Sequence, residues 1–503
     1  MPEQLTAAPR PAAPVDDVPQ HLRAAYTAAL PGARASVLAR LWGALNRENV
    51  PGLDHARLSG DPAAARAFAV AQPGLAVEVA GVAHTDPAAA LRALRLPGAV
   101  DRLATELDNS VHNLALARAN RPARPSPRTT DLATVEQLVV DGHPLHPCCR
   151  TRLGMTTAEV LAYAPEHLPT VALVEVAVPA SRWLSTGAGL PPRLLLHPWQ
   201  ARHTAGAYPW LTPTGRTVPA RPLMSLRTLA LVDDPTIHVK TAVDVQMTSA
   251  VRIVSPAAVH NGPVMSALLA RLTAAMPTLD VLPETAAGAV LVDGEPQRGL
   301  SYVVRRFPAL PPGEVAVPLA ALAAPSPADG RPLLRDVVAP HDPARFLADL
   351  LDIACPPLFA LLDRGVALEA HGQNTLVVLR DGRPVRLLYR DVGGVRVSPA
   401  RLGAAMPELR GDLVTDDADE LRTKLVAAFL TTVVGELIAL LAREYDLPTG
   451  PLWGRVAAAV RAAGAPAQVW RDPLPMKAMT TMRLAADPLD DVWTHVPNPM
   501  AGA

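Results

Sequence analysis

The sequence predicts an α+β protein with a mostly antiparallel central sheet and helical N- and C-terminal parts. Helical spacing dominates the first 130 residues, Val- and Leu-rich runs between Pro-rich turns dominate residues 131–330, and helical patterns return afterwards. At 503 residues the chain is too long for one ordinary core. We therefore expect three domains: a helical one at 1–130, a β-rich one at 131–330, and a helical one at 331–503 that carries a hairpin at 369–391.

Three segments of the first domain have helical signals. Apolar residues recur at helical spacing in Val37–Leu45 and in Val100–Arg118. Asp86 followed by Pro87 is typical of an N-cap and a first helical turn. The Arg- and Pro-rich segment 121–128 is expected to be a linker or a long loop.

The middle of the chain contains six apolar runs with strand character, bounded by turn residues. They are Val171–Val178, Arg193–His197, Leu223–Val232, Ile237–Val245, Val290–Val292 and Tyr302–Arg306. Two of them flank a turn at Asp233-Asp234 and should form a hairpin. Apolar and polar residues alternate in the second, which places Lys240 on a polar face. Ser225 and Arg227 share a face of the preceding strand, so we expect them within a residue or two of Lys240.

The last third is helical on both sides of the hairpin. Phe346–Leu362 precedes it and Leu421–Arg443 follows it. The apolar stretch Leu425–Ala442 contains Glu436, and we interpret it as a buried core helix and not as a membrane span. Lys424 lies in the same helical pattern and is expected to face solvent.

Composition excludes some classes of function and draws attention to three residues. A formal net charge of zero gives no general electrostatic argument for nucleic acid or an anionic membrane. Three cysteines provide no disulfide framework, and residues 1–19 have no apolar signal region. We expect a soluble cytoplasmic protein without nucleic-acid or membrane partners. Of 47 basic residues only Lys240, Lys424 and Lys477 are lysines, so they are candidates for places that need a compact ammonium.

The hairpin at 369–391 is the segment most informative about function. Its two apolar runs, 375–379 and 385–389, flank a turn of sequence Asp-Gly-Arg-Pro. If Gly382 and Arg383 form the centre of the turn, Asn374 lies opposite Asp391, beside His371. An amide oxygen and a carboxylate placed together suit a Mg2+ ion that carries nucleotide phosphates. The alternative is a solvated hairpin end without a ligand.

Five motifs follow one another in a characteristic order. They are Gly142-His143-Pro144-Leu145-His146-Pro147 with Arg150, Arg152 and Gly154; His197-Pro198-Trp199-Gln200; Ser225-Leu226-Arg227-Thr228 through Lys240 to Thr248-Ser249-Ala250-Val251-Arg252; Glu369-Ala370-His371-Gly372-Gln373-Asn374; and Lys477 with Met482-Arg483-Leu484. Each motif alone is weak, but the ordered set resembles the IucA/IucC family of NRPS-independent siderophore synthetases over about residues 100–490.

The resemblance implies a fold, a reaction and a set of partners. Family members are shaped like a cupped hand, so 1–130 would be the thumb, 131–330 the fingers and 331–503 the palm, and they usually form homodimers. They use ATP and Mg2+ to adenylate a carboxylate, most often of citrate or a citrate derivative. An amine or a hydroxyl then attacks to give an amide or ester, with release of AMP and pyrophosphate.

The resemblance also implies roles for individual residues. The nucleotide and phosphate contacts would be Ser225, Arg227, Thr228, Lys240, Thr248 and Arg252, with His371, Gln373, Asn374 and Asp391 on the palm side of the same pocket. His146, Lys477 and Arg483 would bind the carboxylate substrate, Asn374 and Asp391 would hold Mg2+, and His371, Arg252 and Lys240 would be catalytic. There are departures: the family often has Lys where this chain has Arg150. Some members carry a C-terminal stretch related to ferric reductases, but no cysteine follows Cys355 here, which excludes a cysteine-ligated iron–sulfur site in that stretch.

The chemistry of the residues agrees with this assignment, and alternatives remain. ATP and a tricarboxylate together carry about seven negative charges, which cations and a metal must offset. Arg227 and Arg252 could instead be surface ion-pair residues, His143 could brace its loop, His197 and Trp199 could be packing residues, and Glu369 could support His371. The alternative functions are a kinase-like small-molecule phosphotransferase, in which an Asn and an Asp also hold Mg2+, and a non-enzymatic protein that binds a polycarboxylate or a chelate.

Overall fold

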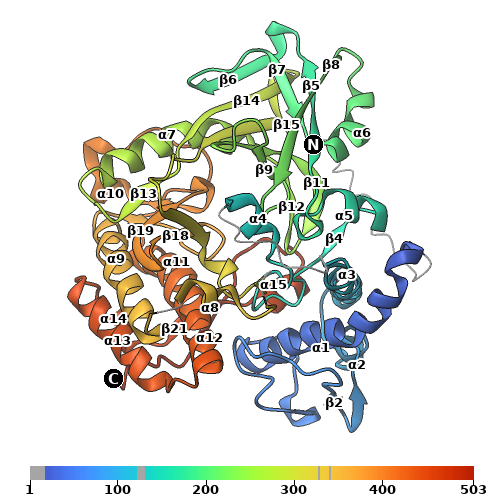
Figure 1. The fold of residues 1–503 in the computed structure, drawn as a ribbon, viewed down its shortest axis with the longest axis vertical. Helices are drawn as coiled ribbons and strands as arrows, with labels where there is room; N and C mark the ends of the chain where they lie inside the picture. The colour runs from blue at the N-terminus through green and yellow to red at the C-terminus, as the bar shows by residue number, and fades with distance from the viewer. Residues whose placement is uncertain (1–16, 122–130, 327–328, 339–340, 503) are drawn as a thin grey trace.

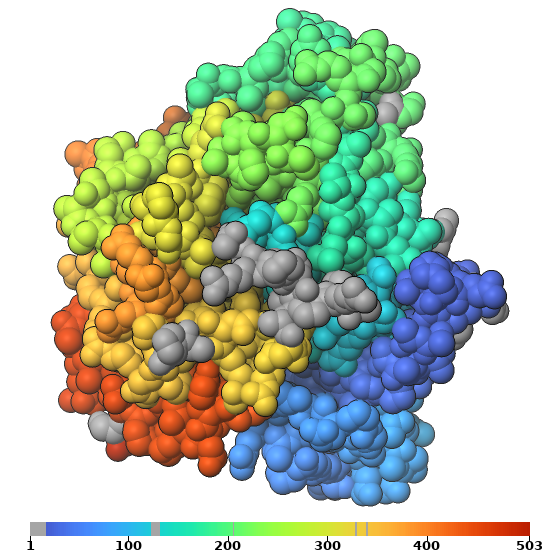
Figure 2. Space-filling model, viewed as in Figure 1, coloured from blue at the N-terminus to red at the C-terminus, as the bar shows by residue number. Residues whose placement is uncertain are grey.

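The computed structural model describes residues 17–121, 131–326, 329–338 and 341–502. Most of the predicted linker at 121–128 lies outside these residues. The N-terminal helices form one end of the molecule, a large sheet forms another, and the C-terminal helices lie beside both (Figure 1). In the space-filling view the N-terminal part (blue) lies at the lower right, the part with the large sheet (green) at the top, and the C-terminal part (orange and red) at the lower left (Figure 2).

The N-terminal part is built on two long helices, α1 (Arg23–Arg47) and α3 (Val100–Ala119), which pack against each other. The short α2 (Pro87–Ala93) begins as predicted, because the Asp86 side chain accepts a hydrogen bond from the N–H of Ala89. The helices expected at 37–45 and 100–118 are thus confirmed. A small sheet of β1 (Leu58–Gly60), β2 (Val77–Val79) and β3 (Val82–His84) was not predicted.

The central sheet has eight strands, and all neighbours in it run antiparallel. In spatial order they are β6 (Trp183–Gly187), β14 (Glu284–Val292), β15 (Glu295–Arg306), β10 (Ile237–Thr241), β9 (Thr228–Leu231), β8 (Thr212–Pro222), β5 (Val171–Ala177) and β7 (Arg193–Leu196). The predicted mostly antiparallel sheet is confirmed. Helix α7 (Pro256–Thr273) packs on β14 and β15 (Figure 1).

Two predicted strands are shorter than expected. The run Leu223–Val232 is a strand only at β9, because a turn with Leu226 at φ 65° precedes it. The run Ile237–Val245 breaks at Ala242 into β10 and β11 (Val243–Met247), and β11 belongs to a separate sheet with β12 (Ala250–Arg252) and β4 (Arg152–Leu153). The predicted polar face of β10 is not solvated, since His238 and Lys240 are both buried.

A second sheet carries the hairpin. Its order is β13 (Leu279–Val281), β19 (Arg383–Tyr389), β18 (Thr375–Arg380) and β16 (Glu314–Pro318), with only the β13–β19 pair parallel. Helix α9 (Pro343–Asp363) packs on β19. The helices expected at 346–362 and 421–443 are confirmed, the second as α11 (Ala418–Leu425), a π-helical segment (Val426–Val434) and α12 (Gly435–Tyr445).

Short elements complete the described chain. The helices are α4 (Leu132–Gln137), α5 (Thr157–Tyr163), α6 (Pro198–Thr204), α8 (Leu333–Val338), α10 (Pro399–Leu402), α13 (Thr449–Ala462), α14 (Gln468–Arg471) and α15 (Met479–Leu484). Two further pairs of strands are β17 (Val366–Ala367) with β20 (Arg396–Val397) and β21 (Leu474–Lys477) with β22 (Trp493–Val496).

Two large hydrophobic cores organise these elements. One joins the N-terminal helices to the central sheet, and the other joins the C-terminal helices to the hairpin sheet. The apolar stretch Ala418–Tyr445 is long enough to cross a membrane, but 78% of its most apolar window is buried inside the protein. This agrees with a core helix. The cupped-hand description and the three domain boundaries stay predictions.

Candidate functional site

The first wall of the site is the hairpin of β9 and β10. Lys240 lies opposite Thr228 in this ladder and therefore one residue from Arg227, as the sequence predicted. Ser225 does not share a strand face with Arg227, because both residues lie in the turn that precedes β9. Its hydroxyl instead accepts a hydrogen bond from the N–H of Thr228 (3.2 Å), which fixes the turn.

Two guanidinium groups lie beside Lys240. Arg227 donates to the carbonyl of Ile253, and the Nη2 of Arg252 donates to the carbonyl of Met247 (3.1 Å). Loss of solvation lowers the pKa of Arg252 to about 10, with further contributions from the nearby Arg227 and Arg152. Within the described residues neither Arg227 nor Arg252 forms a salt bridge. The alternative that these two arginines are surface ion-pair residues is therefore wrong. Both keep positive charge available for an anion.

The second wall is the hairpin of β18 and β19, and its predicted register is wrong by one residue. Thr375 lies opposite Tyr389, and the N–H of Arg390 donates to the carbonyl of Asn374 (2.9 Å). Asn374 therefore faces Arg390 and not Asp391.

The turn explains the shift. Its centre is Asp381 and Gly382, at φ 52° and 76°, as a type I′ turn requires, and not Gly382 and Arg383. This centre alone would place Asn374 opposite Tyr389, but the ladder shifts back by one residue next to Pro384, which has no N–H to donate, so Asn374 faces Arg390. The shift leaves Asp391 just beyond the paired strands.

Asp391 connects the two walls. Its Oδ1 lies 2.7 Å from the Nζ of Lys240, across 151 residues of sequence, and the Lys240 ammonium is also 3.8 Å from the Glu284 carboxylate. Desolvation raises the pKa of a buried carboxyl, but here Lys240 and then Arg227 outweigh it and hold the pKa of Asp391 well below its usual range. Asp391 is thus an anion whose backbone has a φ of 70°, a conformation that costs a non-glycine residue about 1–2 kcal/mol.

His371 and Asn374 begin the same hairpin. The His371 carbonyl accepts the N–H of Asn374 (2.9 Å) and of Thr375 (3.0 Å), so the segment forms a tight turn. Desolvation lowers the pKa of His371 although Glu369 and Asp391 oppose the shift, and the imidazole is therefore neutral near pH 7. The Oδ1 of Asn374 accepts no hydrogen bond from the described part of the chain.

A buried ion pair that the sequence did not reveal supports this turn. The guanidinium of Arg390 binds the carboxylate of Glu136 with two hydrogen bonds (2.5 and 3.0 Å), and its Nε donates to the carbonyl of Gln373 (3.0 Å). Glu136 also accepts the N–H of Met224 (2.9 Å), just before Ser225. One pair therefore links the hairpin to the turn that carries Ser225.

All three lysines of the chain lie at this site. Lys424 was expected to face solvent, but it is buried and lies 3.0 Å from the Glu369 carboxylate. Lys477 is 3.9 Å from the same carboxylate and 2.8 Å from Asp491. A Cβ at Gly394 would meet the Glu369 carboxylate at 2.0 Å, so glycine is needed for that close approach. These contacts join the Glu369 carboxylate to two lysines, and the role of Glu369 in supporting His371 stays a prediction.

His146 and His143 hold the loop between α4 and β4. The Nδ1 of His146 accepts the N–H of Cys148 (2.9 Å), which assigns the ring proton to Nε2, and Nε2 donates to the Ser249 hydroxyl (2.7 Å). His143 braces the loop as expected, because its Nδ1 accepts the N–H groups of Leu145 and His146 (both 3.2 Å). Desolvation lowers the pKa of both rings, that of His143 to about 3.

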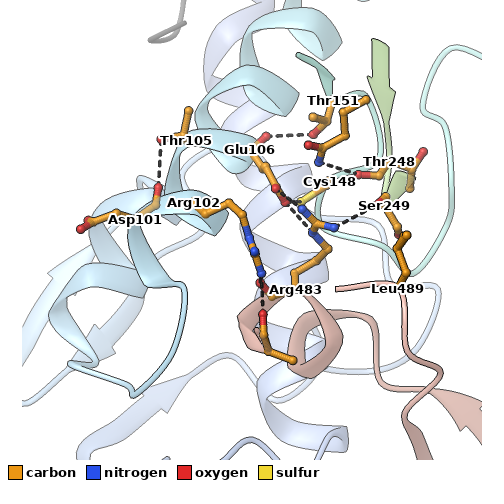
Figure 3. Close-up of polar contacts among 12 residues, drawn as sticks. Asp101, Arg102, Thr105, Glu106, Cys148, Thr151, Thr248, Ser249, Arg483 and Leu489 are labelled. Carbon is orange, nitrogen blue, oxygen red and sulfur yellow. Dashed lines mark hydrogen bonds and ion pairs between the residues drawn. The ribbon is translucent and has the colours of Figure 1, made fainter. Parts of the chain in front are cut away.

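Arg483 is buried and lies behind Ser249. Its guanidinium binds the carboxylate of Glu106 and donates to the carbonyl of Ser249 (2.7 Å), as Figure 3 shows. Arg483 was predicted to bind a carboxylate of the substrate, but its guanidinium is already bound to Glu106 and Ser249. Glu106 is one more residue that the sequence did not single out, and Ser249 stood in a quoted motif without an assigned role.

The remaining predicted residues lie in the same region. Thr248 forms the tip between β11 and β12 with a φ of 58°, and Gln373 offers its backbone carbonyl to Arg390. His197 and Trp199 are buried, with the Nδ1 of His197 accepting the Trp199 N–H (3.1 Å), and they act in packing as expected. Around Asp391 the site thus combines the cations of Arg227, Lys240 and Arg252 with the open amide oxygen of Asn374, a set of groups that fits a polyanion bound with a hard divalent cation.

Comparison with protein families supports the assignment from motifs. Residues 131–189 and 193–324 match the IucA / IucC family, and residues 344–499 match a family described as ferric iron reductase FhuF-like transporter. Staphyloferrin A synthase of Staphylococcus aureus is 30% identical over 361 residues. The match covers 62% of this chain and 62% of that relative.

Solved structures share the fold. The petrobactin biosynthesis protein AsbB of Bacillus anthracis superposes with a TM-score of 0.82 at 19% identity and covers 96% of this chain and 98% of its own. The ATP-bound aerobactin synthetase IucA of Klebsiella pneumoniae gives a TM-score of 0.76 at 19% identity, covering 92% and 99%. The ordered motifs, the matched family and the shared fold together place this chain in the IucA/IucC family of siderophore synthetases.

Proposed function

We propose that this protein is an ATP-dependent siderophore synthetase, an acid–amine ligase that adenylates a carboxylate of citrate or a citrate derivative. Formation of the acyl-adenylate releases pyrophosphate, and the amine or hydroxyl then attacks its carbonyl carbon, takes the acyl group and releases AMP. The observation that carries the proposal is the group of Arg227, Lys240 and Arg252 around Asp391, with neutral His371 beside it.

The charges of this group suit the two substrates. ATP and a tricarboxylate repel each other strongly, and a site that brings them together must hold fixed positive charge in a medium of low dielectric constant. Lys240 and the two arginines supply that charge from β10, from the start of β9 and from β12. Ser225, Thr228 and Thr248 place hydroxyl groups along the same wall.

Asn374 and Asp391 are the residues that would hold Mg2+. Asp391 stays ionised because its pKa is lowered by Lys240 and Arg227 in spite of desolvation, and the Asn374 Oδ1 has no partner in the described chain. When bound, Mg2+ would offset the charge of the phosphate oxygens. Lys240 fixes the orientation of Asp391 for this role.

The protein itself would contribute alignment and charge stabilisation. A carboxylate held in line with the α-phosphate needs little more than correct placement to react. Arg252 and Lys240 would stabilise the negative charge on the oxygens of the α-phosphate, and His371 would hydrogen-bond as a neutral imidazole. Lys477, half-buried on β21, would bind a carboxylate of the substrate, with His146 behind Ser249. The family resemblance adds a homodimer to the proposal.

The test is an assay of nucleotide products across a panel of carboxylic acids that includes citrate and its monoamides. AMP and pyrophosphate that depend on one acid are expected, with trapping of the activated acid by hydroxylamine. ADP as the product would support the phosphotransferase instead. Tight binding of an acid without any use of ATP would support a binding protein.

Matched variants would connect the reaction to the site. Arg252→Met should abolish AMP formation, because it removes a guanidinium from the cationic wall. Arg306→Met is the control, since Arg306 is exposed on the neighbouring strand β15 and pairs with Asp234. Loss of activity in both variants would contradict the assignment of the site to Arg252.

A further inference from the structure

Arg483 joins three segments that are far apart in the sequence. Its Nε donates to the Glu106 carboxylate (2.8 Å) on α3, 377 residues away, and a second hydrogen bond runs from Nη2 to the same carboxylate. Its Nη1 donates to the carbonyl of Ser249 (2.7 Å), in the turn between β11 and β12. Arg483 lies on α15, and Figure 3 shows the three segments meeting at its guanidinium.

The pair is closed to solvent. The side chain of Arg483 is 3% exposed and that of Glu106 is 0% exposed. Glu106 neutralises the guanidinium charge, and its Oε2 also accepts from the Cys148 thiol (3.6 Å). A substrate carboxylate would have to displace Glu106 to bind Arg483, which leaves a buried carboxylate unpaired.

Helix α15 is anchored at both ends to the N-terminal helices. At its start the Glu48 carboxylate accepts the N–H groups of Thr480 (3.1 Å) and Thr481 (2.8 Å). At its end the Nη2 of Arg102 donates to the carbonyls of Arg483 (2.7 Å) and Ala485 (2.6 Å). The backbone around Arg483 is therefore held in place by contacts that do not involve Ser249.

The turn that Arg483 holds belongs to the proposed nucleotide site. Thr248 has a φ of 58°, a conformation that a non-glycine residue keeps only where its surroundings enforce it. Arg483 holds the Ser249 carbonyl, His146 holds the Ser249 hydroxyl (2.7 Å), and Arg252 binds the Met247 carbonyl (3.1 Å). The placement of Thr248 and Arg252 thus depends on contacts to the back of the turn.

We propose that Arg483 and Glu106 form a clasp that positions the Thr248–Arg252 turn, and that Arg483 is a positioning residue and not a substrate ligand. This inference rests on the proposed function for its kinetic part. It also predicts a structural effect that can be measured without any catalysis.

The structural test is hydrogen exchange of the peptides that span residues 247–252. Arg483→Met and Glu106→Gln should each raise the exchange rate of these amides at least tenfold. The double variant Arg483→Met/Glu106→Leu removes both buried charges, which restores the thermal midpoint toward that of the wild type but leaves the turn without its donor. Its turn should therefore still exchange fast. Protection equal to the wild type in the double variant would overturn the clasp.

The kinetic test separates positioning from substrate binding. If the clasp positions the turn, both single variants lower kcat/KM at least tenfold for ATP and for the acid together, and the double variant stays impaired. A rise in KM for the acid alone in Arg483→Met, with normal kinetics in Glu106→Gln, would show that Arg483 is a substrate ligand and overturn the proposal. Arg335→Met is the control, since it removes an Arg–Glu pair between α8 and α12, away from the turn. If the wild type makes no AMP with any acid, the proposed function fails while hydrogen exchange still decides the clasp.

Discussion

Replacement of Lys424 by methionine tests the least expected residue of the site. Methionine keeps much of the length of the side chain and removes the ammonium that lies 3.0 Å from the Glu369 carboxylate. Breaking a buried ion pair by removal of one partner costs about 3–5 kcal/mol. Here the Glu369 side chain is 22% exposed and keeps Lys477 at 3.9 Å, so we halve that figure. We expect the free energy of unfolding to fall by about 2 kcal/mol, which for a chain of 503 residues lowers the thermal midpoint by about 2 °C.

The same variant should also impair the reaction. The Glu369 carbonyl accepts the N–H of His371 (2.9 Å), so a Glu369 side chain that has lost its main partner loosens the start of the hairpin. We expect AMP formation to fall roughly tenfold, which corresponds to about 1.4 kcal/mol. Lys424→Arg keeps the charge but needs more room than the buried site offers, and it should lie between the wild type and Lys424→Met.

Urea denaturation and steady-state AMP formation measure the two effects separately. An unfolding free energy within about 0.5 kcal/mol of the wild type, together with normal kcat/KM, would refute the reasoning. Lys424 would then behave like the solvent-facing helix residue that the sequence predicted.

Three further predictions concern acid stability, the anion and one guanidinium. Desolvation lowers the pKa of buried His197 to about 3, so the folded protein binds fewer protons than the unfolded one below pH 6.5; stability is full above that pH and falls by about 1.4 kcal/mol per unit on acidification toward pH 3. Urea titrations at pH 7.5, 6 and 5 give the free energy of unfolding at each pH. This free energy should fall less steeply with decreasing pH in His197→Gln than in the wild type, and an equal fall would contradict the assignment to His197. Asp391→Ala should abolish AMP formation and lower the thermal midpoint, because the buried Lys240 ammonium loses its nearest carboxylate, while the fold seen by circular dichroism and the oligomer size on gel filtration persist; retained activity would exclude a metal-ligand role. Arg252→Lys should lower turnover at least tenfold if the guanidinium grips phosphate with two hydrogen bonds, whereas Arg306→Lys should not.

Local signals in the sequence predicted the local structure well. The cap at Asp86, the hairpin around 233–234 and the neighbourhood of Arg227 and Lys240 follow from turn chemistry and strand pairing, which depend on residues close in sequence. The register of the second hairpin was predicted wrongly, although the signals for the observed register are also local. Asp-Gly is the preferred centre of a type I′ turn, and the proline at 384 marks a strand irregularity that shifts the ladder by one residue.

The buried charges could not be predicted in the same way. Lys424, Glu106 and Arg390 have polar side chains in patterns typical of solvated helix and strand ends, and their partners lie 55, 377 and 254 residues away. Only the completed fold brings the partners together and removes water from them. The rarity of lysine was the one sequence signal that pointed to Lys424, and it conflicted with the helical pattern.

The gathering of every lysine at one site has a consequence for reactivity toward acylating agents. If the proposed reaction takes place, an activated acyl group that leaves the site finds no lysine elsewhere on the protein to modify. Apart from the α-amino group, amine-directed reagents can react only at Lys240, Lys424 and Lys477, which are buried or half-buried beside carboxylates. The extent of labelling at each, read by peptide mass mapping, therefore reports directly on how a bound nucleotide or acid changes the accessibility of the site.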